Sequence, residues 1–272
     1  MTQSLHPPII TKLSSNNPGK SVAIIVGVHG NEKGPQYEWD WLNSLEVLKG
    51  TLHLIFANPT AGELNKRFIN VNLNRRFGDN TNEFPEDELA RAIEKVLDQC
   101  EVSLDLHMYN EAMDRPFVIC NEKSNHIAKV LPVNYIVNFP NDQKGGSTDD
   151  YMASNGKFGV CFETGSVDRS IDCSNIIREC VLSFLGLYDL IKHEAQENAN
   201  VKILIKNETK IVENPDIQFS KNYASFDSLK AGEVICTEAG KEYTAKRDCY
   251  ILFPRPNNSV GTEAYYTLIE TK

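Results

Sequence analysis

Three short segments of the sequence place side chains that can bind a metal ion directly after an apolar run. The segment GVHGNE contains His29 and Glu32, LDLH contains His107, and CFETG contains Glu163. A single tight turn can aim two ligands three residues apart at one ion, and a third ligand from another segment leaves one tetrahedral position for water. That open position is typical of a catalytic zinc site. A carboxylate that is not a ligand, such as Glu163, can then act as a general base.

The His-x-x-Glu spacing alone is a weak signal for a metal site. Gly27 and Gly30 flank His29 at the end of its apolar run and strengthen the signal. The competing interpretation is that His29 and His107 are ordinary polar residues of loops. The other histidines lack such a setting and are expected at the surface or in the core; they are His6, His53, His126 and His193.

A basic segment, KRFINVNLNRRF, lies between two of the candidate ligand segments. It contains Arg67, Asn74, Arg75 and Arg76 in an otherwise acidic chain. Arginine suits planar, two-pronged contacts with carboxylates. The segment therefore indicates a binding site for a small carboxylate, with a solvated basic loop as the alternative.

Buried strands must bring these segments together. Residues 22–26 are a continuous apolar run typical of a strand buried on both faces, residues 102–107 are expected to form another strand, and residues 158–165 a further buried strand. The carboxyl ends of parallel strands meet at one edge of a sheet, where α/β proteins bind ligands. If these strands are parallel neighbours, the four candidate side chains converge at that edge.

The remaining pattern predicts an α/β fold with a mainly parallel sheet, followed by a β region. Further strands are expected at 51–59, 116–121 and 133–139, and helices over 33–48, from Pro85 to Leu97 and over 174–196. The polar loop 141–150 is a candidate lid. After the polar stretch that ends near residue 197, only short alternating runs follow. We therefore expect an α/β catalytic domain over 1–197 and a small β domain over 198–272.

Composition and charge exclude several classes of protein. The 272 residues include 28 Lys and Arg against 37 Asp and Glu, a net charge of −9, which disfavours nucleic acid as a partner. No apolar run approaches the ~20 residues of a membrane helix, and the N-terminus does not resemble a signal peptide. Seven scattered cysteines without CxxC spacing indicate a reducing cytoplasm, with most of them buried as small core residues.

In this order, GVHGNE, NLNRRF, DLH and FETG resemble the succinylglutamate desuccinylase/aspartoacylase family, which is related to the zinc carboxypeptidases. The segment TEAYY (262–266) also resembles a part of aspartoacylases, so the resemblance spans residues 27 to 266. It implies a zinc-carboxypeptidase-like α/β fold whose small β domain covers the active site. It also implies a hydrolase with one Zn²⁺ per chain that cleaves the amide bond of a small N-acyl amino acid bearing a carboxylate.

The resemblance implies a chemical role for five residues. His29, Glu32 and His107 would be the zinc ligands, and zinc would lower the pKa of its water to about 7. Glu163 would act on that water as general base and then serve as general acid. Arg67 would polarise the scissile carbonyl and stabilise the negative oxygen that develops there.

The same resemblance implies the residues that hold the substrate. Asn74 and Arg75 would bind a substrate carboxylate, and Tyr265 would reach the substrate from the β domain. Asp105 lies two residues before His107 on the same strand face, so it could orient that ligand from behind.

The sequence departs from the family pattern at two positions. Asn72 replaces the usual Asp before Leu-Asn-Arg, which removes a negative charge near the arginines. Ala153 stands where aspartoacylases carry an Arg for the side-chain carboxylate of the substrate, and the nearest basic residue is Lys157. N-acetylaspartate is therefore not transferred as the substrate. Three other cations could compensate, namely Arg115, Lys144 and Arg169.

Two other functions fit the same residues. A zinc carboxypeptidase that trims short peptides would use the same ligands and carboxylate clamp, although a covering β domain would exclude long substrates. A non-catalytic family member would keep the fold and bind a metal, a metabolite or a partner without turnover.

Overall fold

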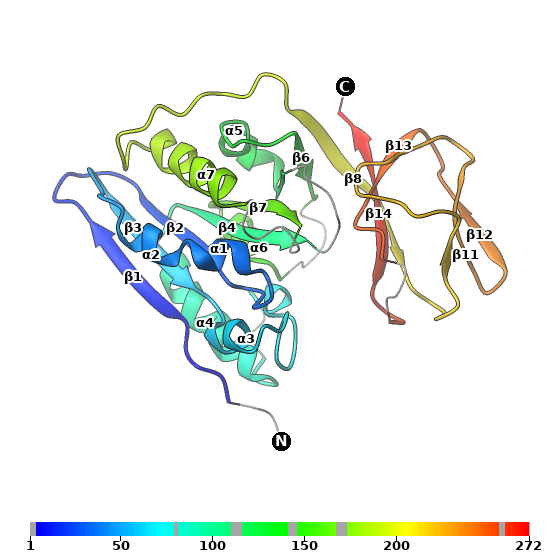
Figure 1. Ribbon diagram of the computed structural model, residues 1–272, viewed down its shortest axis with the longest axis horizontal. Helices are drawn as coiled ribbons and strands as arrows, with labels where there is room; N and C mark the ends of the chain where they lie inside the picture. Colours follow the sequence, from blue (N-terminus) through cyan, green and yellow to red (C-terminus); the bar gives the residue numbers. More distant parts are fainter. Residues whose placement is uncertain are drawn as a thin grey trace.

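A computed structural model describes residues 4–78, 81–109, 116–140, 146–166, 173–255 and 259–271. A mixed sheet of 11 strands runs through the whole molecule (Figure 1). In spatial order its strands are β1 (Ile9–Ser14), β3 (Thr51–Phe56), β2 (Ser21–Val26), β4 (Val102–Tyr109), β7 (Phe158–Ser166), β5 (Phe117–Cys120), β6 (Tyr135–Asn138), β8 (Lys202–Ile211), β14 (Glu263–Glu270), β13 (Cys249–Leu252) and β10 (Ser228–Leu229). A second sheet contains β12 (Lys241–Thr244), β11 (Val234–Glu238) and β9 (Gln218–Phe219).

The strands that precede the candidate ligands lie at the centre of the sheet. Strand β4 pairs in parallel with β2 on one side and with β7 on the other, so the three carboxyl ends lie side by side. All eight residues of β4 are buried. The expected parallel arrangement is therefore confirmed.

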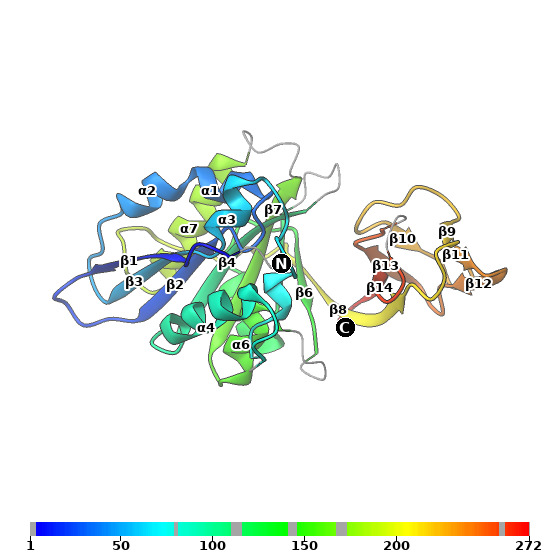
Figure 2. The ribbon, with the colours of Figure 1, turned by 90° about the horizontal axis from the view of Figure 1, so that it is seen from below.

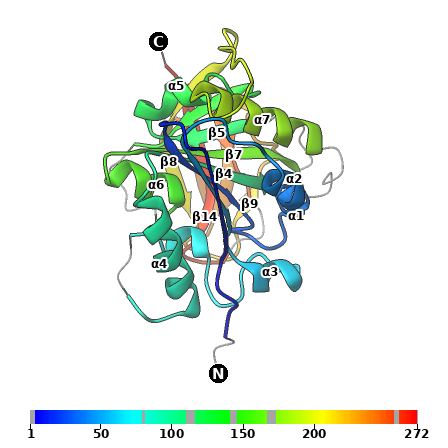
Figure 3. The ribbon, with the colours of Figure 1, turned by 90° about the vertical axis from the view of Figure 1, so that its left-hand side faces the viewer.

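Helices cover both faces of this central sheet, as Figures 2 and 3 show. One layer contains α1 (Lys33–Tyr37), α2 (Trp39–Asn43), α5 (Asn125–Ala128) and α7 (Ser174–Leu187), and the opposite layer contains α4 (Pro85–Leu97) and α6 (Thr148–Ser154). Short connections contain α3 (Pro59–Glu63) and the 3-10 turns η1 (Leu73–Arg75) and η2 (Glu122–Ser124). In β2, Ile24 faces the core under α7 and its neighbour Ile25 faces the core under α4. Because both faces of β2 are buried, every residue of its apolar run contacts a core.

Two predicted helices differ from the observed ones. The helix expected over 33–48 is broken at Glu38, whose buried carboxylate accepts a hydrogen bond from Arg178 of α7 at 2.6 Å. The helix expected over 174–196 ends at Leu187, because Asp189 adopts a left-handed φ of 52° and the chain folds back. A Cβ on Gly186 would lie 2.5 Å from the carbonyl oxygen of His193, so glycine permits that return.

The C-terminal β region continues the central sheet. Strand β8 pairs in parallel with β6 through residues 202–205 and antiparallel with β14 through residues 204–211. An apolar cluster joins the two parts; it contains Tyr109, Phe117, Val137, Leu204, Phe226, Leu252, Tyr266 and Leu268. The predicted domain boundary lies between residues 197 and 198, just before β8. Strand β8 pairs with β6, which precedes the boundary, and with β14, which follows it, so one sheet continues across the boundary. The predicted fold class, a helix-flanked and mainly parallel sheet with a small C-terminal β region, is confirmed.

The seven cysteines are all buried and none forms a disulfide with another described residue, as expected for small core residues. Among the described residues, no helix is both long enough and apolar enough to cross a bilayer. Strand β1 was missed by the sequence prediction. It pairs antiparallel with β3 at the edge of the sheet and is largely exposed, so it lacks a buried apolar run.

Candidate metal centre and active site

The turn after β2 requires two glycines. Gly27 has a φ of 68°, and a Cβ there would lie 2.4 Å from the ring of Phe56. A Cβ on Gly30 would lie 2.0 Å from the backbone of Ala61. Because no larger residue fits, the chain can turn tightly enough to direct His29 and Glu32 to the same side.

The three predicted ligands converge at the carboxyl edge of the sheet. Nδ1 of His29 lies 2.7 Å from one carboxylate oxygen of Glu32, and Nδ1 of His107 lies 3.0 Å from the other. One ligand atom from each residue lies within 4.8 Å of the others, and all three side chains are buried. The amide of Met108 also donates to Glu32 at 3.0 Å, which fixes the carboxylate.

Both histidines present Nδ1 to the centre and are held from behind through Nε2. Nε2 of His107 lies 2.9 Å from a carboxylate oxygen of Asp105, which also accepts a hydrogen bond from Thr148 at 2.6 Å. Nε2 of His29 lies 3.0 Å from the amide oxygen of Asn72. Such partners orient metal-binding imidazoles and tune their basicity. Asn72 thus supports His29 through a neutral amide, whereas Asp105 supports His107 through a carboxyl group.

The electrostatics of this cluster favour a positive charge between the ligands. Burial opposes ionisation of Glu32, but the charges and hydrogen bonds of His29 and His107 together lower its pKa well below the usual range. Burial likewise disfavours the charged form of His107, but the nearby carboxylates of Asp105 and Glu32 raise its pKa well above the usual value. Burial dominates at His29 and lowers its pKa. The set therefore combines a firmly ionised carboxylate with imidazole nitrogens.

Glu163 lies opposite His107 in the β4–β7 pairing and is almost fully buried. Burial raises its pKa to about 7, with the charge of Glu32 adding to the shift and those of His107 and Arg67 opposing it. One of its carboxylate oxygens is buried without a hydrogen-bond partner among the described residues. Such a buried carboxyl oxygen next to the imidazole of His107 fits a role in proton transfer near a metal-bound ligand. The donor set of two nitrogens and one carboxylate fits a divalent metal ion such as zinc.

The first turn of α4 supports the basic segment. Glu86 is fully buried and accepts hydrogen bonds from the amides of Ile69 at 3.3 Å and Asn70 at 2.8 Å. The segment before these residues brings Arg67 to Glu32, where its guanidinium donates to the carboxylate at 2.9 Å. Sequence reasoning missed this role of Glu86, although an acidic residue at the start of a helix next to a basic loop is a recognisable pattern.

Arg76 does not belong to the site. Its guanidinium donates to Asp87 of α4 at 2.6 Å and lies over the ring of Phe84, with 5.6 Å between the guanidinium carbon and the ring centroid. The expectation that three arginines of this segment cluster beside the metal site is therefore wrong for Arg76. Its neighbour Arg75 points the other way, because successive side chains of the turn η1 diverge.

Asn74 and Arg75 border the site on the side of the β region. The side-chain oxygen of Asn74 accepts a hydrogen bond from the amide of Thr148 at 3.3 Å, and within the described ranges its amide nitrogen has no recorded hydrogen bond. Arg75 is partly exposed, donates to the backbone oxygen of Asn74 at 2.8 Å and lies 3.7 Å from the carboxylate of Glu263 in β14. The β region thus reaches the arginine segment directly.

The structure places Tyr265 away from the arginines. Its ring is buried in the core of the C-terminal β region, 5.8 Å from the ring of Phe219 between centroids. For the next residue, Tyr266, burial raises the pKa of the hydroxyl to about 12, with the charge of Glu263 adding to the shift and that of Arg75 opposing it. The pairing of β14 is irregular between residues 263 and 265. The expected contact of Tyr265 with substrate therefore disagrees with its position.

No cation replaces the missing arginine at Ala153 in the described part of α6. Lys157 cannot do so, because its ammonium donates to the carbonyls of Leu97 and Asp98 at 2.9 and 2.8 Å, at the opposite edge of the sheet. Arg115, Lys144 and Arg169 lie outside the described residues, as do residues 141–145 of the candidate lid.

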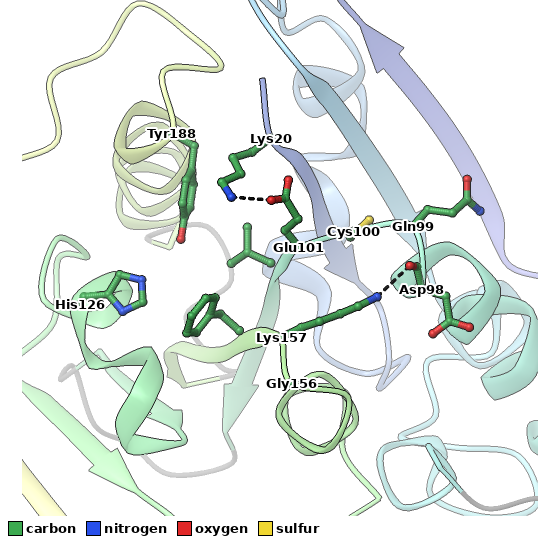
Figure 4. A pocket seen from close by; sticks show the side chains of 11 residues that line it. Lys20, Asp98, Gln99, Cys100, Glu101, His126, Gly156, Lys157 and Tyr188 are labelled. Atoms are coloured by element: carbon green, nitrogen blue, oxygen red, sulfur yellow. Dashed lines mark hydrogen bonds and ion pairs between the residues drawn. The ribbon is translucent and has the colours of Figure 1, made fainter. Parts of the chain in front are cut away.

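A hollow of about 530 Å³ lies at the amino edge of β4 and β7 (Figure 4). Its lining includes Lys20, Glu101, His126, Lys157 and Tyr188. Lys20 is paired with Glu101, and Lys157 is held by the end of α4. None of the predicted site residues lines this hollow, which is separated from the metal ligands by the length of the central strands.

The described geometry matches a group of known proteins. A family model for the succinylglutamate desuccinylase/aspartoacylase catalytic domain matches residues 18–186. Succinylglutamate desuccinylase from Serratia proteamaculans is 23% identical in an alignment of 279 positions that covers 92% of this chain and 85% of that protein. The structure of succinylglutamate desuccinylase from Vibrio cholerae superposes with a TM-score of 0.82 at 19% identity, covering 96% of this chain and 85% of that chain. A product-bound structure of the ectoine utilization protein EutE from Ruegeria pomeroyi gives a TM-score of 0.75 at 18% identity, covering 96% and 88%.

Proposed function

The chain belongs to the succinylglutamate desuccinylase/aspartoacylase family, and from this premise we propose that it is a zinc-dependent amidohydrolase that cleaves the amide bond of a small N-acyl amino acid. The observation that carries the proposal is the buried convergence of His29, Glu32 and His107 beside Glu163. A structural metal site would need a fourth protein ligand, whereas this arrangement supplies three and a separate carboxyl group.

His29 and His107 would bind the metal through Nδ1, with Glu32 as the third ligand. When bound, zinc supplies Lewis acidity that lowers the pKa of water to about 7. A carboxyl group with a pKa of about 7, as Glu163 has, can both accept and return a proton at neutral pH. Glu163 would remove a proton from the attacking water and deliver it to the amide nitrogen as the carbon–nitrogen bond breaks. The products are then a carboxylate and a free amino acid.

The arginines would bind the substrate on either side of the scissile bond. Arg67 is held next to the metal ligand Glu32, where its charge would stabilise the negative oxygen that develops on the carbonyl. Arg75 and the amide nitrogen of Asn74 would bind a substrate carboxylate. The net charge of −9 repels large polyanions, whereas the local positive charge of the arginines attracts a small anion, so the site favours small anions.

Two observations weigh against the alternative functions. Glu263 of β14 lies 3.7 Å from Arg75, so the β region borders the substrate site and leaves less room for a peptide. A non-catalytic protein would not need a buried carboxyl group with a pKa near 7 at the centre of its sheet.

A substrate screen tests the proposal. The purified chain is given zinc, freed of excess metal and assayed for metal content. It is then incubated with N-acyl amino acids in which the acyl group and the amino acid vary separately, and with dipeptides of similar size. We expect about one zinc per chain and release of free amino acid from at least one N-acyl compound. Faster cleavage of the dipeptides would indicate a carboxypeptidase, and neither zinc uptake nor hydrolysis would indicate a non-catalytic protein.

A further inference from the structure

A third arginine reaches the site from the C-terminal β region. Arg255 follows β13, and its guanidinium lies 3.8 Å from the carboxylate of Glu263. The same carboxylate lies 3.7 Å from Arg75, so the two guanidiniums flank one carboxylate from two different parts of the chain. The Arg255 side chain is 38% exposed, which leaves surface for a further partner.

The chain after β13 is bent so that Arg255 faces the catalytic domain. Phe253 adopts a left-handed φ of 49°, which a bulky residue rarely does, and its amide donates to Ser225 at 2.9 Å. The guanidinium carbon of Arg255 lies 5.3 Å from the centroid of the Phe253 ring. This ring packs in turn against Tyr109 and Phe117 of the catalytic domain, with centroids 6.5 and 5.7 Å apart. Apolar packing between the two parts therefore sets the position of Arg255.

The carboxylate of Glu263 does not cancel the positive charge of Arg75 and Arg255 together. It is a single negative charge between two arginines, and both separations exceed hydrogen-bond distance, so Arg255 donates no hydrogen bond to Glu263. Among the described residues, Glu263 is the only carboxylate within ion-pair distance of Arg255. Burial lowers the pKa of Arg255, and the charges of Arg67 and Arg75 add to that shift, whereas Tyr266 and Glu263 oppose it.

We infer that Arg255 is a specificity-determining residue that binds a second carboxylate of the substrate, next to the carboxylate held by Asn74 and Arg75. This inference rests on the proposed function, and it narrows the substrate to N-acyl amino acids with at least two carboxylates. The second one belongs to the acyl group or to the amino-acid side chain. Arg255 thereby supplies from the β region the cation that is missing at Ala153.

The test compares wild-type enzyme loaded with zinc with the variants Arg255→Met and Arg255→Lys. Methionine keeps much of the stem and removes the charge, and lysine keeps the charge without the planar fork. Arg247→Met is the matched control, because Arg247 is exposed and precedes β13 at the end opposite to Arg255. Thermal unfolding of each variant establishes that it folds.

Two substrate pairs, each differing by one carboxylate, are measured by kcat/KM: N-succinyl against N-butyryl amino acids, and N-acetylglutamate against N-acetylglutamine. For one of these pairs, we expect Arg255→Met to lower kcat/KM for the compound with the extra carboxylate by about 10- to 100-fold, mostly through KM. The matched compound should change less than about twofold, Arg255→Lys should be intermediate and Arg247→Met should resemble wild type. Equal losses for both members of each pair, or no loss at all, would overturn the assignment.

A binding measurement separates this inference from the proposed function. Calorimetric Kd values for glutarate and butyrate are determined with the same zinc-loaded proteins, without turnover. We expect Arg255→Met to weaken glutarate about 10- to 100-fold and to leave butyrate unchanged. If wild type cleaves no N-acyl compound but shows this difference, the proposed reaction is wrong and Arg255 still binds the second carboxylate. If wild type binds glutarate no better than butyrate, the role of Arg255 is wrong whatever the enzyme cleaves.

Discussion

The two ends of the central strands carry similar types of residue, but the residues at the two ends have different roles. At the carboxyl edge, His107 of β4 and Glu163 of β7 are buried and converge with Glu32. At the amino edge, Glu101 and Lys157 border a hollow of about 530 Å³. Each of these amino-edge groups is already satisfied, by Lys20 and by carbonyls at the end of α4. A hollow with charged walls is therefore less informative than a cluster of buried ionisable groups that converge at one point.

Proton affinity separates the two edges in the same way. At the carboxyl edge, burial raises the pKa of Glu163 to about 7, so that its charge can change at neutral pH. At the amino edge, the hydrogen bond from Lys20 lowers the pKa of Glu101, which keeps that carboxylate ionised. The comparison predicts that substitutions at the carboxyl edge change chemistry and metal binding, whereas those at the amino edge change stability slightly.

The largest effect is expected for Glu163→Gln. The amide keeps the size of the side chain but cannot accept and return a proton, so kcat should fall by about 10²- to 10⁴-fold. Zinc content should stay at the wild-type value, because Glu163 is not among the three ligands. Steady-state kinetics and metal analysis of the same preparation measure both quantities. Wild-type turnover by this variant would remove Glu163 from the mechanism.

A smaller effect is expected for Asp105→Asn, which tests the support behind the metal ligands. Asp105 holds Nε2 of His107 at 2.9 Å, and an amide in its place would be a weaker acceptor. Zinc affinity should fall by about 10- to 100-fold, as measured by competition with a chelator. The variant Thr148→Val is the control, since it removes the hydrogen bond from Thr148 to Asp105 without changing the contact between Asp105 and the imidazole of His107. A zinc affinity unaffected by Asp105→Asn would show that the ligands are held by packing alone.

A pH-dependent effect on stability is expected at Asp149, which lies behind the site. Burial raises its pKa from 3.8 to about 6 in the folded protein. Between these values the folded state binds more protons than the unfolded state, so this group's contribution to stability falls as the pH rises from about 4 to about 6. Asp149→Asn should remove that loss and raise the free energy of unfolding at pH 8 by on the order of 2 kcal/mol relative to wild type. Chemical denaturation of both proteins at pH 4, 6 and 8 measures it, and parallel pH profiles would contradict it.

Local sequence patterns were sufficient to locate the carboxyl edge. The buried strands are rich in apolar residues, and the candidate side chains lie in the last residues of these strands or directly after them. His29, Glu32, His107 and Glu163 were predictable for that reason, and their convergence followed from the parallel order of β2, β4 and β7.

Side-chain directions outside regular strands were not predictable in this way. Arg75 and Arg76 are adjacent, yet the first faces Glu263 and the second faces Asp87. The irregular pairing of β14 exchanges the faces of Tyr265 and Tyr266. Arg255 reaches the arginine segment only through packing between residues distant in sequence, so no local pattern indicates it.

The smallest effect is expected at the amino edge, for the ion pair between Lys20 and Glu101. Both side chains are 51% exposed, so water and salt screen the pair and its coupling energy should be at most about 1 kcal/mol. A double-mutant cycle with Lys20→Met and Glu101→Gln, measured by denaturant unfolding, gives this energy, and it should shrink further in high salt. Glu101 also accepts a hydrogen bond from the backbone amide of Ser21 at 3.1 Å, so Glu101→Gln alone should cost more than Lys20→Met. Because these residues lie a full strand length from His107 and Glu163, kcat/KM and zinc content should match wild type in all three variants. A loss of activity or metal at constant stability would mean that the amino edge is coupled to the site, and the contrast between the two edges would then fail.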